Sequence, residues 1–273
     1  MEKQEHTAVL ITGAAGGVGH ALVSMALTLP DIERVVAADI SERITALYGD
    51  DEKVVPVVTD VSGEGALRQM RERLRHEGIR VKYLVNNAGI FFFHPVSELT
   101  QELFDRIVGV NTRAAVLTVS IFLDDLVALQ GRVVQVSTCG VRFPTLFQPY
   151  PASKVAMEAF SISMRQELAL LGVSLSLVRA GAIDTPLMRE MGDLPMPHER
   201  SRYKEWYGRF LAMTGERVGR VVPPEAMART VRKALTARRP QRLYVINRNP
   251  TIRWLSWLPQ TWLDTLLERW VGR

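Results

Sequence analysis

A tyrosine and a lysine four residues apart, in the stretch Tyr150-Pro-Ala-Ser-Lys154, are the first candidates for acid–base chemistry. On a helix, residues at this spacing share one face, so the phenol and the ammonium can approach each other. A free tyrosine has a pKa of about 10, and a fixed cation nearby favours the phenolate and lowers that value. We therefore predict that Tyr150 is a general acid or base tuned by Lys154. Taken alone, the spacing is weak evidence and is more typical of a solvated helix face.

A serine precedes this pair at the end of a predicted strand. Residues 131–138 form an apolar run that includes Ser137, whose hydroxyl could bind a substrate oxygen beside the phenol. Pro151 suits the first turn of a helix, where its missing N–H costs nothing. The sequence predicts a helix from about Tyr150 to Leu171, ended by Gly172.

A glycine-rich turn follows the first predicted strand, Thr7–Thr12. It carries Gly13, Gly17 and Gly19 and runs into a helix start. Glycines let the backbone turn sharply and approach a pyrophosphate, and the helix N-terminus supplies N–H groups and positive potential. In this strand–turn–helix context the pattern predicts a dinucleotide site, whereas a glycine-rich loop alone is as often a structural turn.

An acid ends the second predicted strand, Arg34–Asp39. A carboxylate about twenty residues past the glycines can accept hydrogen bonds from the adenosine ribose and would repel a 2′-phosphate. Ala15 and Ile40, where a basic side chain could instead meet that phosphate, are neutral, and Arg43 is the one cation nearby. We therefore predict that NAD(H) is preferred and NADP(H) is possible. Asp39 could otherwise be a helix-start carboxylate.

Two further strands end in residues suited to the same edge. Residues 54–61 predict a third strand ending in Asp60 and Val61, which could flank an adenine, and residues 81–89 predict a fourth that ends in Asn86-Asn87-Ala88-Gly89. Small residues there permit close approach of a cofactor. Residues 100–129 predict one long helix with Thr100 as N-cap. Asn111 lies within it, a position that read alone fits a satisfied core amide.

The fold class follows from the alternation of strands and helices. Residues 173–178 and 242–246 predict the last two strands, with a helix opened by Pro223-Pro224 before the second. At 273 residues and 47% hydrophobic content, this pattern predicts a single doubly wound parallel α/β sheet of about seven strands.

Composition excludes several classes of protein. The chain holds one cysteine, Cys139, so no intramolecular disulfide forms. We find neither a signal-peptide pattern nor a spanning apolar run, and expect a cytoplasmic protein. Ten Lys/Arg against Asp264 and Glu268 give the stretch from Arg229 to Arg273 a charge of +8, although the whole chain carries +5. This placement argues against a nucleic-acid groove on the main body. No metal site is predicted.

Taken together, these residues closely resemble the classical short-chain dehydrogenase/reductase family. The resemblance covers roughly residues 7 to 247 and rests on ordered motifs: Thr12-Gly13-x-x-x-Gly17-x-Gly19, Asn86-Asn87-Ala88-Gly89, Asn111, Ser137 and Tyr150-x-x-x-Lys154. Each motif is weak alone, but the ordered set is specific. It implies a Rossmann-like sheet of seven strands with NAD(P) across its carboxyl edge, and it favours a homodimer or homotetramer.

The resemblance also implies a role for each residue. Tyr150 would be the general acid/base, Lys154 would lower its pKa and bind the nicotinamide ribose, and Ser137 would position the reacting oxygen. Asn111 would hold a water that links Lys154 to solvent. The cofactor would contact residues matching the family's motifs: Gly13, Gly17, Val18, Gly19, Asp39, Asp60, Val61, Asn87, Ala88, Gly89, Tyr150, Lys154, Ile183 and Thr185. One departure is Ala180-Gly181 in place of the usual Pro-Gly, which predicts a looser backbone there.

Apolar residues surround the predicted site. Phe91-Phe92-Phe93 follows the Asn-Asn-Ala-Gly motif, and Val141, Phe143, Leu146 and Phe147 lie between Ser137 and Tyr150. Such a lining suits a bulky steroid-, retinoid- or lipid-like alcohol or ketone. Core or subunit-interface positions are the alternative for these phenylalanines. His94 reads as a loop histidine.

The C-terminal stretch differs from the rest. We divide the chain into a catalytic domain, residues 1–249, and an extension, residues 250–273, that holds four of the five tryptophans. One predicted helical face carries Trp262, Leu263, Leu266, Leu267 and Trp270. A basic, Trp-rich amphipathic segment is typical of a helix at a membrane interface, so we expect possible peripheral contact with the cytoplasmic face of a membrane. Packing on a neighbouring subunit or capping the substrate mouth are alternatives.

The functional hypotheses are therefore three. The first is an NAD-dependent alcohol dehydrogenase or ketone reductase for a bulky apolar substrate. The second is an NADPH-linked carbonyl reductase of broad scope. The third is a dinucleotide-sensing or membrane-scaffold protein without catalysis, against which the intact Ser137, Tyr150 and Lys154 argue.

Overall fold

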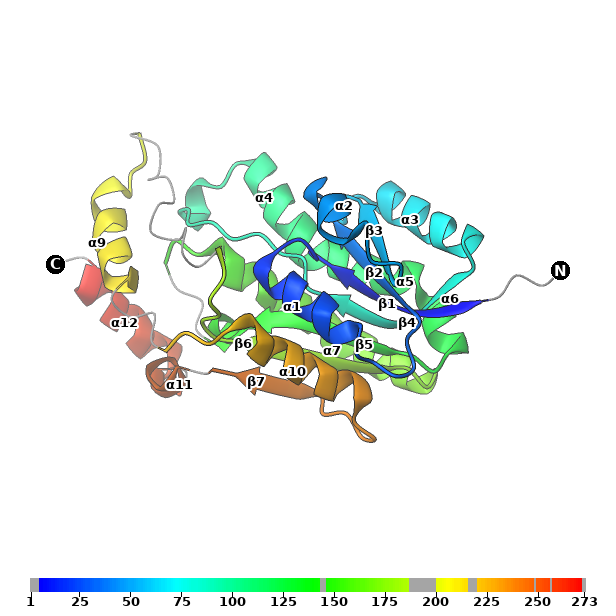
Figure 1. Cartoon of the computed structure of the whole chain (residues 1–273). Helices are drawn as coiled ribbons and strands as arrows, with labels where there is room; N and C mark the ends of the chain where they lie inside the picture. Colours follow the sequence, from blue (N-terminus) through cyan, green and yellow to red (C-terminus); the bar gives the residue numbers. More distant parts are fainter. Residues whose placement is uncertain are drawn as a thin grey trace.

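A parallel sheet of seven strands forms the centre of the molecule, in the order β3-β2-β1-β4-β5-β6-β7 (Figure 1). The computed structural model describes residues 5–142, 146–186, 200–215, 220–247, 249–255 and 257–271. The strands are β1 (His6–Thr12), β2 (Arg34–Asp39), β3 (Val54–Val58), β4 (Ile79–Asn86), β5 (Arg132–Thr138), β6 (Ser174–Ala180) and β7 (Leu243–Ile246). This confirms the predicted doubly wound α/β fold.

Helices connect the strands and cover both faces of the sheet (Figure 1). They are α1 (Gly17–Ala26), α2 (Arg43–Tyr48), α3 (Glu64–His76), α4 (Gln101–Val108), α5 (Ala114–Ile121), α6 (Leu123–Ala128), α7 (Pro149–Leu170), α9 (Lys204–Gly215), α10 (Pro224–Thr236), α11 (Pro250–Leu255) and α12 (Gln260–Val271). Gly172, in the left-handed region at φ +78°, follows the end of α7, as the sequence predicts.

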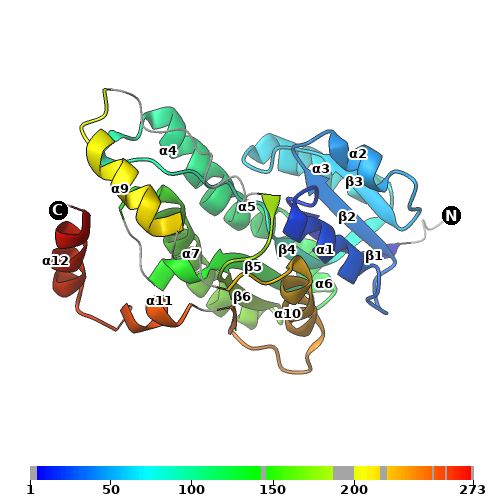
Figure 2. The same cartoon turned by 60° about the vertical axis from the view of Figure 1, so that its left-hand side comes forward.

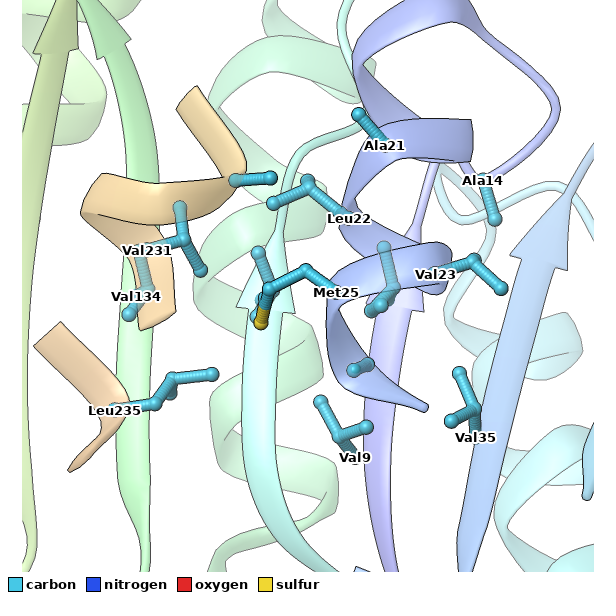
Figure 3. Close-up of a cluster of buried hydrophobic side chains, with 14 of the residues drawn as sticks. Val9, Ala14, Ala21, Leu22, Val23, Met25, Val35, Val134, Val231 and Leu235 are labelled. Carbon is cyan, nitrogen blue, oxygen red and sulfur yellow. The ribbon is translucent and has the colours of Figure 1, made fainter. Parts of the chain in front are cut away.

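The core has one layer on each face of the sheet. Leu22 and Met25 of α1 and Val231 and Leu235 of α10 cover one face, over Val9 of β1 (Figure 3). The other layer holds Leu67 and Leu74 of α3 with residues of α5, α6 and α7. Because both faces are covered, β1 reads as the continuous apolar run Ala8–Ile11, with no exposure at any position.

The stretch predicted as one long helix is interrupted. Thr100 does cap it, because its Oγ1 accepts from Leu103 N at 3.2 Å. The chain then passes through a π-helical turn, Gly109–Arg113, before α5, and α6 follows after Phe122. A π turn inserts an extra residue and rotates the following side chains. Asn111 lies within this turn and is fully buried, so the irregular turn sets where its amide points.

The C-terminal helices α11 and α12 lie beyond β7, at the end of the molecule that also carries α9 (Figures 1 and 2). Leu263 of α12 is buried, whereas Trp254, Trp257 and Trp262 are 75%, 78% and 66% exposed. No helix in the described part of the chain has both the length and the hydropathy needed to cross a bilayer. The boundary at residue 249 between domain and extension stays a prediction.

Candidate active site

The strand ends bring the predicted residues to one edge of the sheet. The glycine-rich turn follows β1 and the Asn-Asn-Ala-Gly motif follows β4, and these two strands are neighbours with helices leaving on opposite sides. In open α/β sheets, ligands bind at such a switch point, outside the carboxyl ends of the strands. Ser137 lies near the end of β5, directly beside Arg179 of β6 in the register.

The glycine turn packs tightly against the end of β4. Gly13 has φ +67°, and a Cβ there would lie 2.8 Å from Ala88 Cα. A Cβ on Gly19 would lie 2.1 Å from Gly13 O, so only glycine fits both positions. Gly16 caps α1 without a side-chain hydrogen bond, which leaves the first N–H groups of the helix for an anion. The turn fits a pyrophosphate.

Asp39 holds the glycine turn with one oxygen and the start of the next loop with the other. Oδ2 accepts from Ala15 N and Oδ1 from Ser41 N, both at 2.9 Å. A carboxylate has about four acceptor positions, so each oxygen can still accept from a ribose hydroxyl. Burial, and secondarily the Asp39 charge, raises the pKa of Tyr48 to about 12. Asp39 therefore keeps acceptor positions at the predicted ribose site while it holds the turn.

An open pocket of about 510 Å³ lies beside the ends of β2 and β3. It is lined by Ile40, Val57, Val58, Thr59, Asp60, Ala66, Gln69, Met70 and Arg73. Thr59 Oγ1 is buried without a partner in the described structure, so a polar ligand atom would satisfy it. Asp60 lines the pocket, as predicted for an adenine site, while the nearby Val61 is buried and lines a different, water-sized cavity with Lys154. Of this lining, the sequence analysis named Ile40 and Asp60 and did not identify the other residues.

The predicted acid–base residues come from the first turns of α7. Ser153 Oγ donates to Tyr150 O at 2.7 Å and receives a bond from Asn111 Nδ2 at 3.0 Å. Asn111 also exchanges two bonds of 2.9 Å with the backbone of Ile90, one from each end of its amide. A Cβ on Gly89 would lie 3.2 Å from Asn111 Oδ1 and 3.6 Å from Lys154 Nζ. The structure thus brings Gly89, Asn111 and Lys154 together and ties Asn111 through Ser153 to the backbone carbonyl of Tyr150. The approach of the phenol to Lys154 and the water at Asn111 stay predictions.

The electrostatics of Tyr150 differ from the prediction. Burial raises the pKa of Tyr150 to about 12 instead of lowering it. Burial also lowers the pKa of Lys154 to about 8, against the opposing charge of Glu158. The ammonium of Lys154 donates to Val136 O at 3.1 Å. The predicted lowering by Lys154 was wrong, because burial alone accounts for the raised pKa of the phenol and no charge of Lys154 offsets it.

Ser137 has a partner that the sequence analysis did not identify. Its Oγ donates to Glu158 Oε1 at 2.5 Å, and Glu158 is bound by Arg179 through both carboxylate oxygens. Ser137 and Glu158 are 2% and 5% exposed. The signal was present in the sequence, because Glu158 follows Lys154 by one helical turn.

Aromatic rings continue outward from Tyr150. Phe91 lies edge-to-face against Tyr150 with ring centroids 5.3 Å apart, and Phe93 packs on Phe91 at 4.9 Å. Phe210 of α9 then contacts both Phe93 and Phe147. With Tyr203 and Tyr207 these rings form one cluster, which we call the aromatic wall. Phe143 lies outside the described residues, and His94 is a loop residue whose N–H donates to Phe147 O.

The segment after β6 is pinned. Gly181 N donates to Ile246 O at 2.9 Å, and a Cβ on Gly181 would lie 1.9 Å from Asn247 O. The looser backbone predicted from the missing proline was therefore wrong, because pairing with β7 fixes it. Thr185 is close to the glycine turn, 3.4 Å from a Cβ built on Gly17, while Ile183 pairs with Val222. Within the described residues, no group of His, Cys, Asp and Glu could hold a metal ion.

Comparison with known proteins decides the family. The family model described as short chain dehydrogenase matches residues 7–194. The chain belongs to this family. It is thus an oxidoreductase of the short-chain dehydrogenase type.

Relatives with assigned names support the same family. The chain is 27% identical over 296 residues to estradiol 17-beta-dehydrogenase 2 of Rattus norvegicus, covering 97% of this chain and 75% of that one. It is 27% identical to an NADPH-dependent 3-dehydrocapnine reductase of Ornithobacterium rhinotracheale, covering 87% of both. It is 29% identical to retinol dehydrogenase 5 of Homo sapiens, covering 69% of this chain and 64% of that one.

Solved structures show the same fold. A short-chain dehydrogenase from Streptomyces avermitilis is 21% identical and superimposes with a TM-score of 0.74, covering 97% of this chain and 94% of that one. A 4-hydroxyisoleucine dehydrogenase in complex with NADH is 20% identical, with a TM-score of 0.73 over 89% of this chain and 98% of that one.

Proposed function

We propose that this enzyme interconverts an alcohol and a ketone or aldehyde on a bulky apolar substrate, with NAD(H) as its preferred cofactor. The aromatic wall carries the substrate class, because its rings begin in contact with Tyr150 and continue to α9. Phe93, Phe147, Tyr207 and Phe210 are buried against one another, whereas Phe91 and Tyr203 are only partly buried. Phe91 is therefore the ring that an apolar substrate beside Tyr150 would meet first, and it offers no polar group to a sugar or a small acid. The names of the dehydrogenase relatives, estradiol and retinol, agree with this class.

The residues present fit a nicotinamide dinucleotide. The glycine turn would hold the pyrophosphate, Asp39 the ribose, and the pocket lined by Thr59 and Asp60 the adenine. When bound, this cofactor accepts or supplies the hydride. Tyr150 takes the proton of the alcohol in oxidation and returns it in reduction, and Lys154 supplies a positive charge that favours the phenolate.

Fluorescence titration with NADH and NADPH, followed by a screen of apolar alcohols and ketones, tests this function. We expect NADH to bind more tightly, because the Asp39 carboxylate repels a 2′-phosphate. Asp39→Ala should weaken NADH binding and reduce the preference for NADH over NADPH about tenfold or more. Hydrogen bonds to a charged group contribute ~1.5–3 kcal/mol. Because Asp39 also holds Ala15 N, a melting curve controls for loss of the turn. Preference for NADPH in the parent enzyme would instead favour the broad-scope carbonyl reductase.

Binding without turnover of any alcohol or ketone would favour the third hypothesis, a sensing or scaffold protein. In that case Tyr150→Phe would leave the cellular role unchanged.

We further propose that residues 250–273 bind a membrane surface. The side chains of Trp254, Trp257 and Trp262 are all more than half exposed. Tryptophan is enriched at the interface between a bilayer and water. The stretch from Arg229 onward carries a charge of +8, which would attract anionic lipids. The buried Leu263, in contrast, faces the protein, so the predicted apolar face of α12 is divided between protein and solvent.

Cosedimentation with anionic vesicles measures this contact. Replacing Trp254, Trp257 and Trp262 by Ser should release most of the protein from the vesicles, as should deletion of residues 250–273. Replacement of the exposed Phe104 and Phe160, on α4 and α7, by Ser is the matched control and should leave the protein bound to the vesicles. Equal sedimentation of all variants would contradict the proposal and favour the subunit-contact or capping alternatives. A homodimer or homotetramer remains the expectation from the family resemblance.

A further inference from the structure

The Glu158–Arg179 pair lies directly beneath Ser137. Ser137 of β5 and Arg179 of β6 are partners in the parallel register, so their side chains leave the same face of the sheet. α7 packs over that face and supplies Glu158. The carboxylate binds the guanidinium through both oxygens and the seryl hydroxyl through Oε1. Three elements thus converge on one buried carboxylate.

The direction of the Ser137–Glu158 hydrogen bond follows from charge. Arg179 is always charged, and its guanidinium donates hydrogen bonds to both oxygens of Glu158, so the carboxylate acts here as an acceptor. An ionised carboxylate only accepts hydrogen bonds, so the proton between the two oxygens, 2.5 Å apart, is the seryl proton. A hydroxyl has one proton and two lone pairs. Because the Ser137 hydroxyl donates its proton in a hydrogen bond to Glu158, Ser137 can offer only lone pairs to a substrate.

We propose that Glu158, held by Arg179, is a positioning residue that makes Ser137 a hydrogen-bond acceptor toward the reacting oxygen. While Tyr150 is protonated, the hydroxyl proton of a bound alcohol can be donated to such a serine, and it passes to Tyr150 only once the phenolate forms. A carbonyl oxygen has no proton to donate. A carbonyl compound binds well only after the seryl proton leaves the carboxylate, which costs a charge-assisted bond. The site as it stands therefore favours binding of the alcohol over binding of the carbonyl compound. This inference rests on the proposed function.

Glu158→Gln is the informative variant. Arg179 needs an acceptor, so it should bind the amide oxygen and turn the amide NH₂ toward Ser137, in the place of Oε1. The seryl oxygen then accepts, and its proton points to the substrate. We expect inhibition by the carbonyl compound to become about tenfold tighter and the KM for the alcohol to rise by a similar factor.

Two controls separate positioning from structural damage. In a Ser137→Ala background, Glu158→Gln should no longer move the two constants in opposite directions. Glu33→Gln removes another carboxylate, one that pairs with His6 at the opposite edge of the sheet, and should change neither constant. Shifts of both constants in the same direction in Glu158→Gln would overturn the inference.

A second measurement needs no turnover. Glu158→Leu with Arg179→Met removes both charges together, which usually preserves the fold. In the ligand-free protein, Ser137→Ala should raise the unfolding equilibrium constant several-fold when Glu158 is present and much less in the Leu/Met background. Equal effects in both backgrounds would show that the hydrogen bond is absent and overturn the inference. Intact coupling without turnover of any alcohol by the parent enzyme would overturn the proposed function, and with it the role toward substrate.

Discussion

Replacing Tyr150 by Phe is expected to reduce turnover of the alcohol and of the ketone by a factor of roughly 10²–10⁴, the range for loss of a general acid/base. The substitution removes the hydroxyl and keeps the ring, so the edge-to-face contact with Phe91 should persist. Binding of NADH should change little. Steady-state kinetics in both directions, together with NADH titration, measure the effect.

The parent-like NADH affinity serves as the internal control for folding. Retention of more than about a tenth of the parent turnover in Tyr150→Phe would contradict the assignment of the phenol as acid and base. Loss of NADH binding together with turnover would instead mean that the substitution damages the cofactor site.

Replacing Lys154 by Met is the second large expected effect. Met keeps much of the buried aliphatic stem and removes the ammonium that donates to Val136 O. Oxidation needs the phenolate of Tyr150, whose pKa burial already raises to about 12. Because Lys154 is proposed to stabilise the phenolate, loss of its charge should raise that pKa further, so that less phenolate is present at any given pH. We expect oxidation to fall about a hundredfold near neutrality and its pH profile to move to higher pH.

Oxidation rates of the parent enzyme and of Lys154→Met should be compared at and below neutral pH. There the side chain of Lys154, with its pKa lowered to about 8, is charged. Reduction needs the protonated phenol and should keep its pH profile. Lys154→Arg, which retains the charge, is the matched variant and should shift the profile less. A Met variant with the parent pH profile would mean that Lys154 does not act on Tyr150.

Local patterns along the chain were enough to predict the fold. Buried strands with apolar residues on both faces, such as Ala8–Ile11, can only belong to a sheet covered on both sides. Glycines after β1 and a carboxylate after β2 follow from local strand–turn–helix geometry, so their positions were predictable. The helix starting near Tyr150 and its stop at Gly172 depend on Pro151 and on a positive φ, both local properties.

Where the prediction failed, contacts between distant segments decide the outcome. The π turn at Asn111 interrupts a segment whose apolar periodicity predicts one helix. The backbone at Gly181 is fixed by β7, more than sixty residues later. The pKa of Tyr150 depends on how completely the surrounding elements remove it from water, which no spacing along the chain reveals.

The sequence by itself therefore determined the family and the doubly wound sheet, and it predicted Tyr150, Lys154, Ser137 and Asn111 as site residues, since each of these inferences rests on local spacing. Only the tertiary structure placed Glu158 and Arg179 beneath Ser137, because their meeting requires β5, β6 and α7 to pack together. It also gathered Phe91, Phe147 and Phe210 into one wall. Hydrophobic burial acts without regard to distance along the chain, so it brings together residues whose partnership the sequence does not display.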